Sequence, residues 1–285
     1  MSNALIHDIV LQARDGYAIA ATLHRAAHTS NAAVLINSGT GIRRGYYHKF
    51  ARFLAENGCN VLTYDYRGIG GSRPQTLRGF NAHMRDWAQL DMASAAEWCV
   101  HKLQPEKFFV IGHSAGGQLV GLAGINHLVQ GVVLVAAQSG SWRYWPARAH
   151  YRYALMWRLL PLVTGAVGYL PGKLGLGEDL PRGVANEWAQ WCRHPRYLLG
   201  CVADHEQQHY HKLSVPLLAY SFWDDDYAPK LAVEALLREY ASAKLTHIHF
   251  NASNSPAARI GHFGFFREQF RASLWQETLA WLSRI

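Results

Sequence analysis

Ile111-Gly112-His113-Ser114-Ala115-Gly116-Gly117 follows directly on the apolar run Phe108-Phe109-Val110. The pattern predicts a buried strand that stops abruptly, turns on small residues and restarts as a helix. A Ser at the apex of such a G-x-S-x-G turn projects its hydroxyl beyond the sheet. Its own N–H and that of its neighbour then lie at a helix N-terminus, where developing negative charge is stabilised. We therefore expect Ser114 to attack a carbonyl, although a glycine-rich turn with an incidental Ser remains the alternative.

Strands and helices alternate on both sides of this turn. A hairpin is predicted around Asp15-Gly16. Further strands are predicted at 32–37, 60–65, 107–111, 131–137, 215–221 and 246–250, and helices at about 84–102, 231–242 and 268–282. This alternation predicts an α/β fold with a mostly parallel central sheet covered by helices on both faces. Ligands of such sheets bind beyond the carboxyl ends of the strands, where Ser38–Gly41, Arg67–Ser72 and Ser114 fall.

The alternation stops between Trp142 and Lys212, where no clear strand is apparent. Helical spacing returns there, interrupted by Pro161, Pro171-Gly172 and Pro181. We interpret residues 142–212 as a helical cap inserted between the two parts of the sheet, within a single domain spanning 1–285. A helical layer that only packs the core is the alternative. The many Trp and Tyr of this segment, with its excess of Arg, suggest a pocket for an apolar acyl or aromatic group and a substrate carrying an anionic group.

The overall composition is that of an ordinary globular protein, with 49% hydrophobic and 17% charged residues in 285. No apolar run is long enough to span a membrane, and the first residues do not resemble a secretory signal. The four cysteines are widely spaced, so we expect free thiols and a cytoplasmic location. The net charge of +8 is scattered rather than clustered, which argues against nucleic-acid binding.

Two further segments supply a possible base and acid. Asp224-Asp225-Asp226 follows the predicted strand at 215–221, and one of these carboxylates could orient a histidine, although three acids in a row often mark a solvated loop. His262 lies between Gly261 and Phe263-Gly264 in a predicted loop after the last strand, and its glycine neighbours would allow a close approach to Ser114.

These motifs together resemble the α/β-hydrolase superfamily over nearly the whole chain. The resemblance rests on Gly112–Gly116, on Asp65–Ser72 and on the order Ser, Asp, His. Within the superfamily, 177–181, 187–191 and 261–267 look like a bacterial group of predicted serine hydrolases.

The resemblance implies a role for each of these residues. Ser114 would be the nucleophile and His262 the base and then the acid. Asp225, three residues before Ala228-Pro229, would be the triad acid in preference to Asp224 and Asp226. The oxyanion would be held by the N–H groups of Thr40 and Ala115, although Asn37-Ser38-Gly39 replaces the more familiar His-Gly. No cofactor is implied.

The leading hypothesis is therefore a serine hydrolase that cleaves a carboxylic ester, or a thioester or amide, in a small molecule. An acyltransferase would use the same triad with an acceptor other than water, and a binding module would use the fold without catalysis. A zinc enzyme is a further alternative, because His205-Glu206-Gln207-Gln208-His209 spells H-E-x-x-H. We expect no metal, since no obvious third ligand follows.

Overall fold

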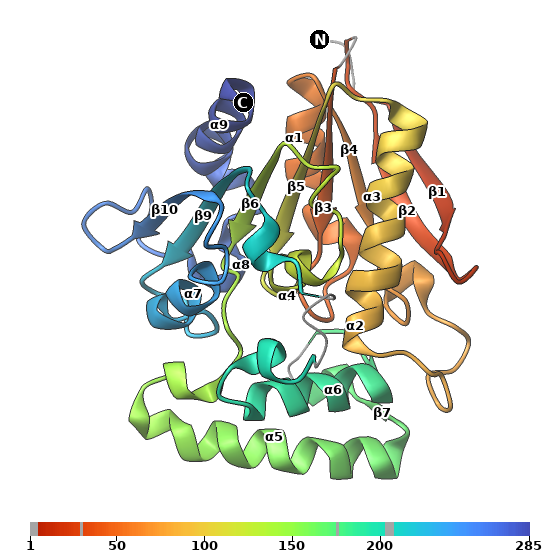
Figure 1. Cartoon of the computed structure of the whole chain (residues 1–285), viewed down its shortest axis with the longest axis vertical. Coiled ribbons are helices and arrows are strands. Elements are labelled where there is room, and N and C mark those ends of the chain that lie inside the picture. The colour runs from red at the N-terminus through yellow and green to blue at the C-terminus, as the bar shows by residue number, and fades with distance from the viewer. Residues whose placement is uncertain (1–4, 29–30, 175–176, 203–207) are drawn as a thin grey trace.

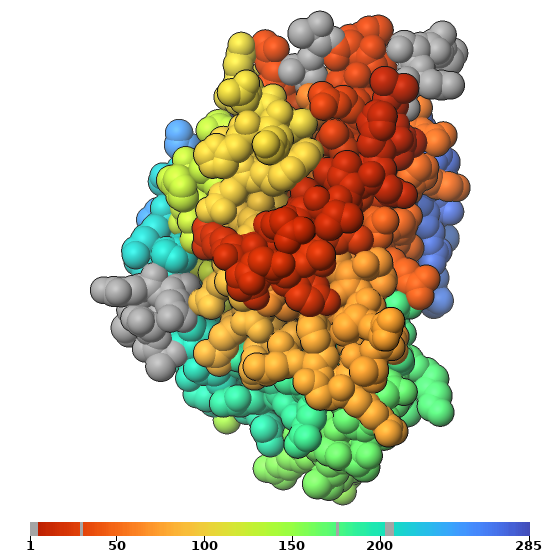
Figure 2. Space-filling view, turned by 90° about the vertical axis from the view of Figure 1, so that its right-hand side faces the viewer, coloured from red at the N-terminus to blue at the C-terminus, as the bar shows by residue number. Residues whose placement is uncertain are grey.

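The computed structural model describes residues 5–28, 31–174, 177–202 and 208–285, and its centre is a sheet of eight strands formed within these residues (Figure 1). In spatial order the strands are β1 (Ile6–Gln12), β2 (Ala18–His24), β4 (Cys59–Tyr64), β3 (Ala32–Asn37), β5 (Lys107–His113), β6 (Gly131–Val135), β9 (Pro216–Phe222) and β10 (Lys244–Phe250). The hairpin β1–β2 is antiparallel and joins β4 antiparallel, whereas every other pair of neighbours is parallel. The predicted α/β fold with a mostly parallel sheet is confirmed, and Figure 2 shows the hairpin covering one edge of it.

The central strands are apolar except at their ends because both faces of the sheet are covered. Their register sets the position of the Ser114 turn. Asn37 at the end of β3 pairs with Gly112 of β5, and Val135 at the end of β6 pairs with His113. The three strands therefore end at the same level, and the loop after β3 begins beside the residue that precedes Ser114.

Helices cover the two faces of the sheet (Figure 1). The α-helices outside the 142–212 segment are α1 (His48–Glu56), α2 (Met84–Asp86), α3 (Ala93–Trp98), α4 (Ala115–Gln118), α7 (Lys230–Leu237), α8 (Gly261–Gly264) and α9 (Gln276–Arg284). Tighter or wider turns extend them: η1 (Arg44–Tyr47), η3 (Trp87–Met92), η4 (Cys99–Leu103), η5 (Leu119–Leu122), η11 (Glu268–Phe270) and η12 (Arg271–Trp275). On one face, Phe50 and Phe53 of α1 pack on Trp275, with ring centroids 5.3 and 5.5 Å apart. The helical stretch that contains α3 lies on the opposite face (Figure 1).

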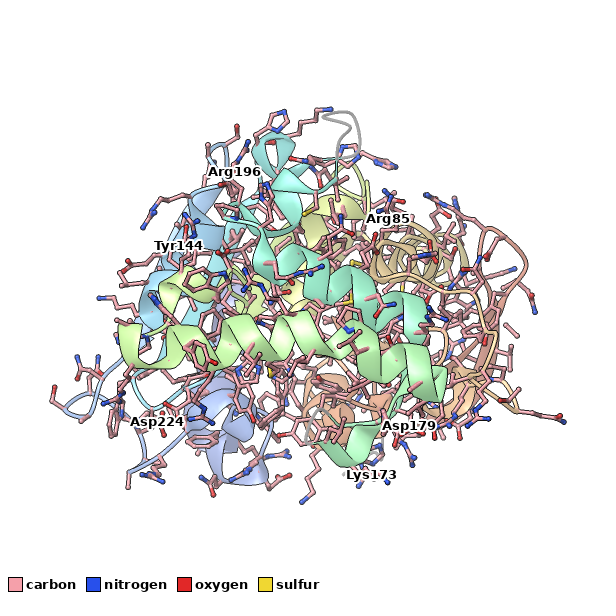
Figure 3. The ribbon with its side chains drawn as sticks, turned by 90° about the horizontal axis from the view of Figure 1, so that it is seen from below. Arg85, Tyr144, Lys173, Asp179, Arg196 and Asp224 are labelled. Atoms are coloured by element: carbon pink, nitrogen blue, oxygen red, sulfur yellow. The ribbon has the colours of Figure 1, made fainter. Side chains whose placement is uncertain are left out.

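Two long helices form a layer beyond the carboxyl ends of the strands, α5 (Ala147–Val167) and α6 (Arg182–Arg193). They pack on each other through Trp157 and Trp188, whose ring centroids are 4.8 Å apart. Seen from this end of the molecule, both helices cross it side by side, and Asp224 and Asp179 lie along the same side of α5 (Figure 3).

The expectation that no strand lies in this segment is wrong. β7 (Tyr169–Leu170) pairs antiparallel with β8 (Leu180–Pro181). Between the two strands, the Asp179 carboxylate accepts a hydrogen bond from the Gly172 N–H at 2.8 Å. A strand of two residues is too short to show the alternation of side chains by which strands are found in a sequence.

The expectation that Pro161 interrupts the helix is also wrong, because α5 continues through it. A proline inside a helix costs about 3 kcal/mol, since its ring removes a backbone N–H. Trp157, Leu160 and Thr164, three or four residues apart, bury the same face of α5, and this packing outweighs the local cost.

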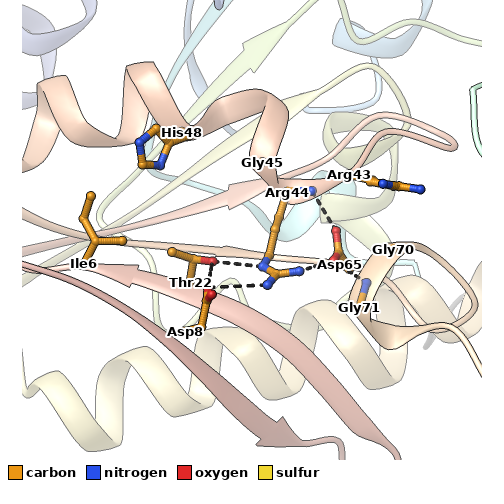
Figure 4. Close-up of a pocket in the computed structure, with 10 residues that line it drawn as sticks. All are labelled: Ile6, Asp8, Thr22, Arg43, Arg44, Gly45, His48, Asp65, Gly70 and Gly71. Atoms are coloured by element: carbon orange, nitrogen blue, oxygen red, sulfur yellow. Dashed lines mark hydrogen bonds and ion pairs between the residues drawn. The ribbon is translucent and has the colours of Figure 1, made fainter.

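The loop after β4 is held by ion pairs inside the scaffold. Asp65 accepts the Arg44 backbone N–H at 2.7 Å and also pairs with the Arg44 guanidinium, beside a cavity of about 530 Å³ (Figure 4). Gly70 has a φ of +48°, and a Cβ there would lie 2.5 Å from the Asp65 carboxylate. Arg67 binds the fully buried Asp91 at 2.8 Å. These ion pairs thus hold the loop at the carboxyl end of β4 against the rest of the scaffold.

One prediction about the chain as a whole is confirmed. All four cysteines are free thiols, and Cys59, Cys99 and Cys192 are buried. Among the helices of the described residues, none has the length and apolar character that crossing a membrane requires.

Candidate active site

The turn at Ser114 has the strained geometry that its glycines make possible. Ser114 has a φ of +50° and a ψ of −120°, which is rare for a residue with a side chain. A Cβ at Gly116 would lie 2.4 Å from the Asn37 carbonyl oxygen, and one at Gly112 would lie 2.5 Å from the Cα of Gly117. Only glycine therefore lets β5 turn into α4 so tightly, which directs Ser114 away from the sheet.

Three residues predicted from the sequence meet at this turn. The Ser114 Oγ lies 2.9 Å from Nε2 of His262, and Nδ1 of His262 lies 2.8 Å from Oδ2 of Asp225. They come from the turn after β5, from α8 and from the loop after β9. His262 is 8% exposed and Asp225 4%, so the hydrogen bond between them is shielded from water, whereas the one to Ser114 is half-buried. The expectation that His262 lies in a loop is wrong, because Gly261–Gly264 form the short helix α8.

The neighbouring aspartates have different surroundings. Oδ1 of Asp225 also accepts the backbone N–H groups of Tyr227 and Ala228, at 2.9 and 2.8 Å. The two oxygens of Asp224 accept the N–H groups of Ile260 and Gly261, at 2.9 and 3.0 Å. Asp224 thus fixes the backbone that leads into His262. Sequence reasoning missed this contact, because it places Asp224 only in a loop of acids.

The expected oxyanion donors belong to the two segments that meet at Ser114, the loop after β3 and the start of α4. Thr40 follows Gly39, where a Cβ would lie 3.4 Å from that of Ser114, and Ala115 is the first residue of α4. Within the described residues, neither N–H donates to a protein acceptor. The expectation that the N–H of Ser114 also faces developing charge is wrong, because it donates to the Val135 carbonyl at 2.9 Å.

Sequence reasoning also missed His113, the residue before Ser114. Its side chain is fully buried, and Nε2 lies 2.9 Å from the backbone carbonyl oxygen of His262. Burial, together with the electrostatic influence of the neighbouring His262, lowers the pKa of His113 from 6.5 to about 3. Its place within the G-x-S-x-G motif is the only sequence signal that could have singled it out.

We expect acid to destabilise the protein, because His113 and a second histidine are buried in their neutral form. Burial lowers the pKa of His24 from 6.5 to about 4. In the unfolded chain both imidazoles bind protons near pH 6.5, so this stability is fully present above that pH. It decreases as the pH falls from 6.5 towards the folded-state values and is fully lost once the pH has fallen through them. Linkage gives a loss on the order of 2 kcal/mol per histidine between pH 7.5 and pH 5.

Urea unfolding at these two pH values measures the effect. His24→Gln, which cannot be protonated and lies on β2, should lose about half of the difference between the two pH values. An equal difference in the variant would contradict the assignment to His24.

Some of the aromatic residues beyond the strand ends belong to the core. Trp191 and Tyr197 are buried, and the Tyr197 hydroxyl donates to Oε1 of Gln118 at 2.7 Å. A cavity of about 720 Å³ lies between α5, α6 and residues 79–85, and it is lined by Arg85, Arg182 and Arg193. The part of its lining that the structure describes does not include Ser114, so an aromatic acyl pocket stays a prediction.

The H-E-x-x-H segment falls partly outside the described residues, since these exclude His205, Glu206 and Gln207. Gln208 is described, and its side-chain amide donates to the Val202 carbonyl at 2.7 Å. Across the described ranges, no three His, Cys, Asp or Glu side chains gather closely enough to hold a metal ion. The zinc alternative is therefore not tested.

Comparisons with known proteins agree with the fold. The profile of the Alpha/beta hydrolase family matches residues 33–269. No curated protein sequence matches significantly. Among solved structures, an esterase from Exiguobacterium antarcticum superposes with a TM-score of 0.63 at 18% identity, over 97% of this chain and 100% of that one. An esterase from Pyrococcus furiosus gives 0.63 at 15%, over 99% and 93% of the two chains. A thermophilic esterase from Thermogutta terrifontis gives 0.58 at 17%, over 98% of each.

Proposed function

Because the chain belongs to the alpha/beta hydrolase family, we propose that it is a serine hydrolase that cleaves carboxylic esters through an acyl-enzyme. One observation carries the proposal. The hydrogen bonds Ser114–His262–Asp225 form an unbroken chain that starts at a strained serine turn. The similar solved structures named esterases support the choice of an ester bond.

Each residue has a defined step. His262 accepts the Ser114 proton at Nε2 as Oγ attacks the ester carbonyl carbon, and the tetrahedral intermediate forms. Asp225 accepts the Nδ1–H, which keeps Nε2 free to accept and stabilises the imidazolium. His262 then donates its proton to the leaving alcohol, and the acyl group stays on Ser114. A water molecule, deprotonated by His262, releases the acid by the same steps.

The N–H groups of Thr40 and Ala115 hold the oxyanion in this proposal. Neither amide donates to an acceptor within the described part of the chain, and two backbone donors fixed in place would need no reorganisation when charge develops. Replacement of the familiar His-Gly by Ser38-Gly39 leaves a backbone donor in place.

We further propose that residues 142–212 act as a cap over this site. The segment contacts the loop of the triad acid, because Nε1 of Trp145 donates to the Asp226 carbonyl at 2.9 Å. Its arginines include Arg148, Arg152 and Arg158, and α5 contains no acidic residue. This charge favours esters that carry an anionic group, and a panel of neutral and anionic esters tests the preference. The cytoplasmic location stays a prediction.

A fluorophosphonate probe tests the proposal directly, because it phosphonylates a serine only when a base activates it. The probe should label Ser114, as mapped by mass spectrometry of the modified peptide. Labelling elsewhere, or none, would contradict the proposal and favour the binding module. Products formed with added alcohols, amines or thiols separate hydrolysis from acyl transfer. Zinc in stoichiometric amount with chelator-sensitive activity would favour the H-E-x-x-H alternative.

A further inference from the structure

We propose that Tyr47 and His113 are positioning residues that hold the oxyanion loop, the nucleophile turn and the helix of the catalytic histidine in one fixed arrangement. The inference rests on the function proposed above and deepens it. Neither residue contacts the reacting atoms, and both act through the segments that they join.

The contacts form a continuous buried path. The hydroxyl of Tyr47 lies 2.8 Å from the Gly39 N and 2.8 Å from Nδ1 of His113. Nε2 of His113 lies 2.9 Å from the backbone oxygen of His262. Both side chains are completely buried, with 0% of their surface exposed. Water therefore cannot replace any of these partners without a change in packing.

The direction of each hydrogen bond follows from one constraint. A carbonyl oxygen only accepts, so Nε2 of His113 must carry the proton that reaches His262. Burial keeps His113 neutral, which leaves Nδ1 as an acceptor. The Tyr47 hydroxyl must then donate to Nδ1, and its oxygen accepts the Gly39 N–H. The path contains a matched donor and acceptor at every step, and a single imidazole tautomer satisfies it.

The path joins the three parts of the proposed catalytic site. Gly39 directly precedes Thr40, His113 directly precedes Ser114, and the last acceptor is the backbone of His262 itself. These parts come from the ends of β3 and β5 and from α8. A Cβ at Gly39 would lie 3.2 Å from Nδ1 of His113, so the loop approaches the imidazole closely. Even a small displacement of the reacting groups lowers the rate of the chemical step. A connection that fixes the positions of all three parts should therefore raise kcat.

Packing alone is the competing explanation. Phe266 contacts both side chains, with ring centroids 4.7 Å from Tyr47 and 5.1 Å from His113. A phenylalanine at position 47 keeps this aromatic contact and removes only the hydroxyl. Tyr47→Phe therefore separates the hydrogen bonds from the packing.

We expect Tyr47→Phe to lower kcat by about 10- to 100-fold on a short p-nitrophenyl ester and to change KM by less than about threefold. The matched control is Tyr220→Phe. Tyr220 lies on β9, and its buried hydroxyl accepts a hydrogen bond from the Thr278 hydroxyl at 3.3 Å, so this variant also loses a buried tyrosine hydroxyl. Its kcat should stay within about twofold of the wild type. A Tyr47→Phe protein with wild-type kcat per folded molecule would overturn the positioning role.

A second measurement reports the path without any catalysis. In ¹⁵N spectra, His113 should be a neutral ring protonated at Nε2 from about pH 5.5 to 8, and Tyr47→Phe should shift the Nδ1 resonance, because that nitrogen loses its hydrogen-bond donor while the Nε2 proton stays on the His262 carbonyl. A wild-type ring protonated at Nδ1 would overturn the proposal. His113→Gln keeps one donor and one acceptor, so it should retain at least about tenfold more kcat than His113→Leu.

The two hypotheses fail in different ways. A wild-type protein that the fluorophosphonate does not label at Ser114 contradicts the proposed function, whatever the spectra show. Normal labelling of the wild type, together with an unchanged kcat in Tyr47→Phe, contradicts the positioning role alone.

Discussion

Ser114→Ala should lower kcat for ester hydrolysis by roughly four to six orders of magnitude while the fold stays intact. Oγ is the atom that would form the acyl bond, and it lies 2.9 Å from the base. Alanine keeps the same Cβ, so the strained turn tolerates it about as well as serine. Steady-state kinetics on short acyl esters measure the loss, and thermal unfolding checks the fold.

Ser94→Ala is the matched control for this variant. Ser94 is also a buried serine, on α3, and its hydroxyl accepts the Arg14 N–H at 2.9 Å. Its loss should cost about 1 kcal/mol of stability and leave kcat unchanged. A Ser114→Ala protein that still hydrolyses esters at the normal rate would refute the nucleophile.

The sequence predicted the centre of the sheet well because the central strands are buried on both faces. Runs such as Val132–Val135 and Phe108–Ile111 contain no polar side chain, which is typical of strands that do not contact water. Glycines mark the turn that follows β5. Such local patterns indicate both the type and the position of each element. The resemblance to a known family then selected Asp225 from three neighbouring aspartates, which spacing alone left open.

What the sequence could not predict depends on contacts between distant segments. Tyr47 and His113 are 66 residues apart, and nothing in either segment indicates that they meet. Pro161 argues locally against a helix that tertiary packing stabilises. β7 and β8 form because Tyr169 and Leu170 pair with Pro181 and Leu180. A strand of two residues carries no sequence pattern from which this pairing could be predicted.

Asp225→Asn should lower kcat by about 10³- to 10⁴-fold, although it replaces only one atom. Oδ1 of Asp225 accepts two backbone N–H groups, so the amide oxygen of asparagine must take this position. The NH₂ group then occupies the place of Oδ2, 2.8 Å from Nδ1 of His262. It donates where the carboxylate accepted, which moves the imidazole proton to Nε2. His262 would then present a donor to Ser114 and could no longer take its proton.

Asp224→Asn is the matched comparison, because it makes the same exchange at the neighbouring residue. Both oxygens of Asp224 accept N–H groups, from Ile260 and Gly261, and asparagine can satisfy only one of them. The backbone before His262 should shift slightly, so we expect a loss of only about tenfold in kcat. Asp226 is exposed, and Asp226→Asn should have no effect on kcat. A larger loss of kcat in Asp224→Asn than in Asp225→Asn would contradict the assignment of Asp225 as the acid that orients the base.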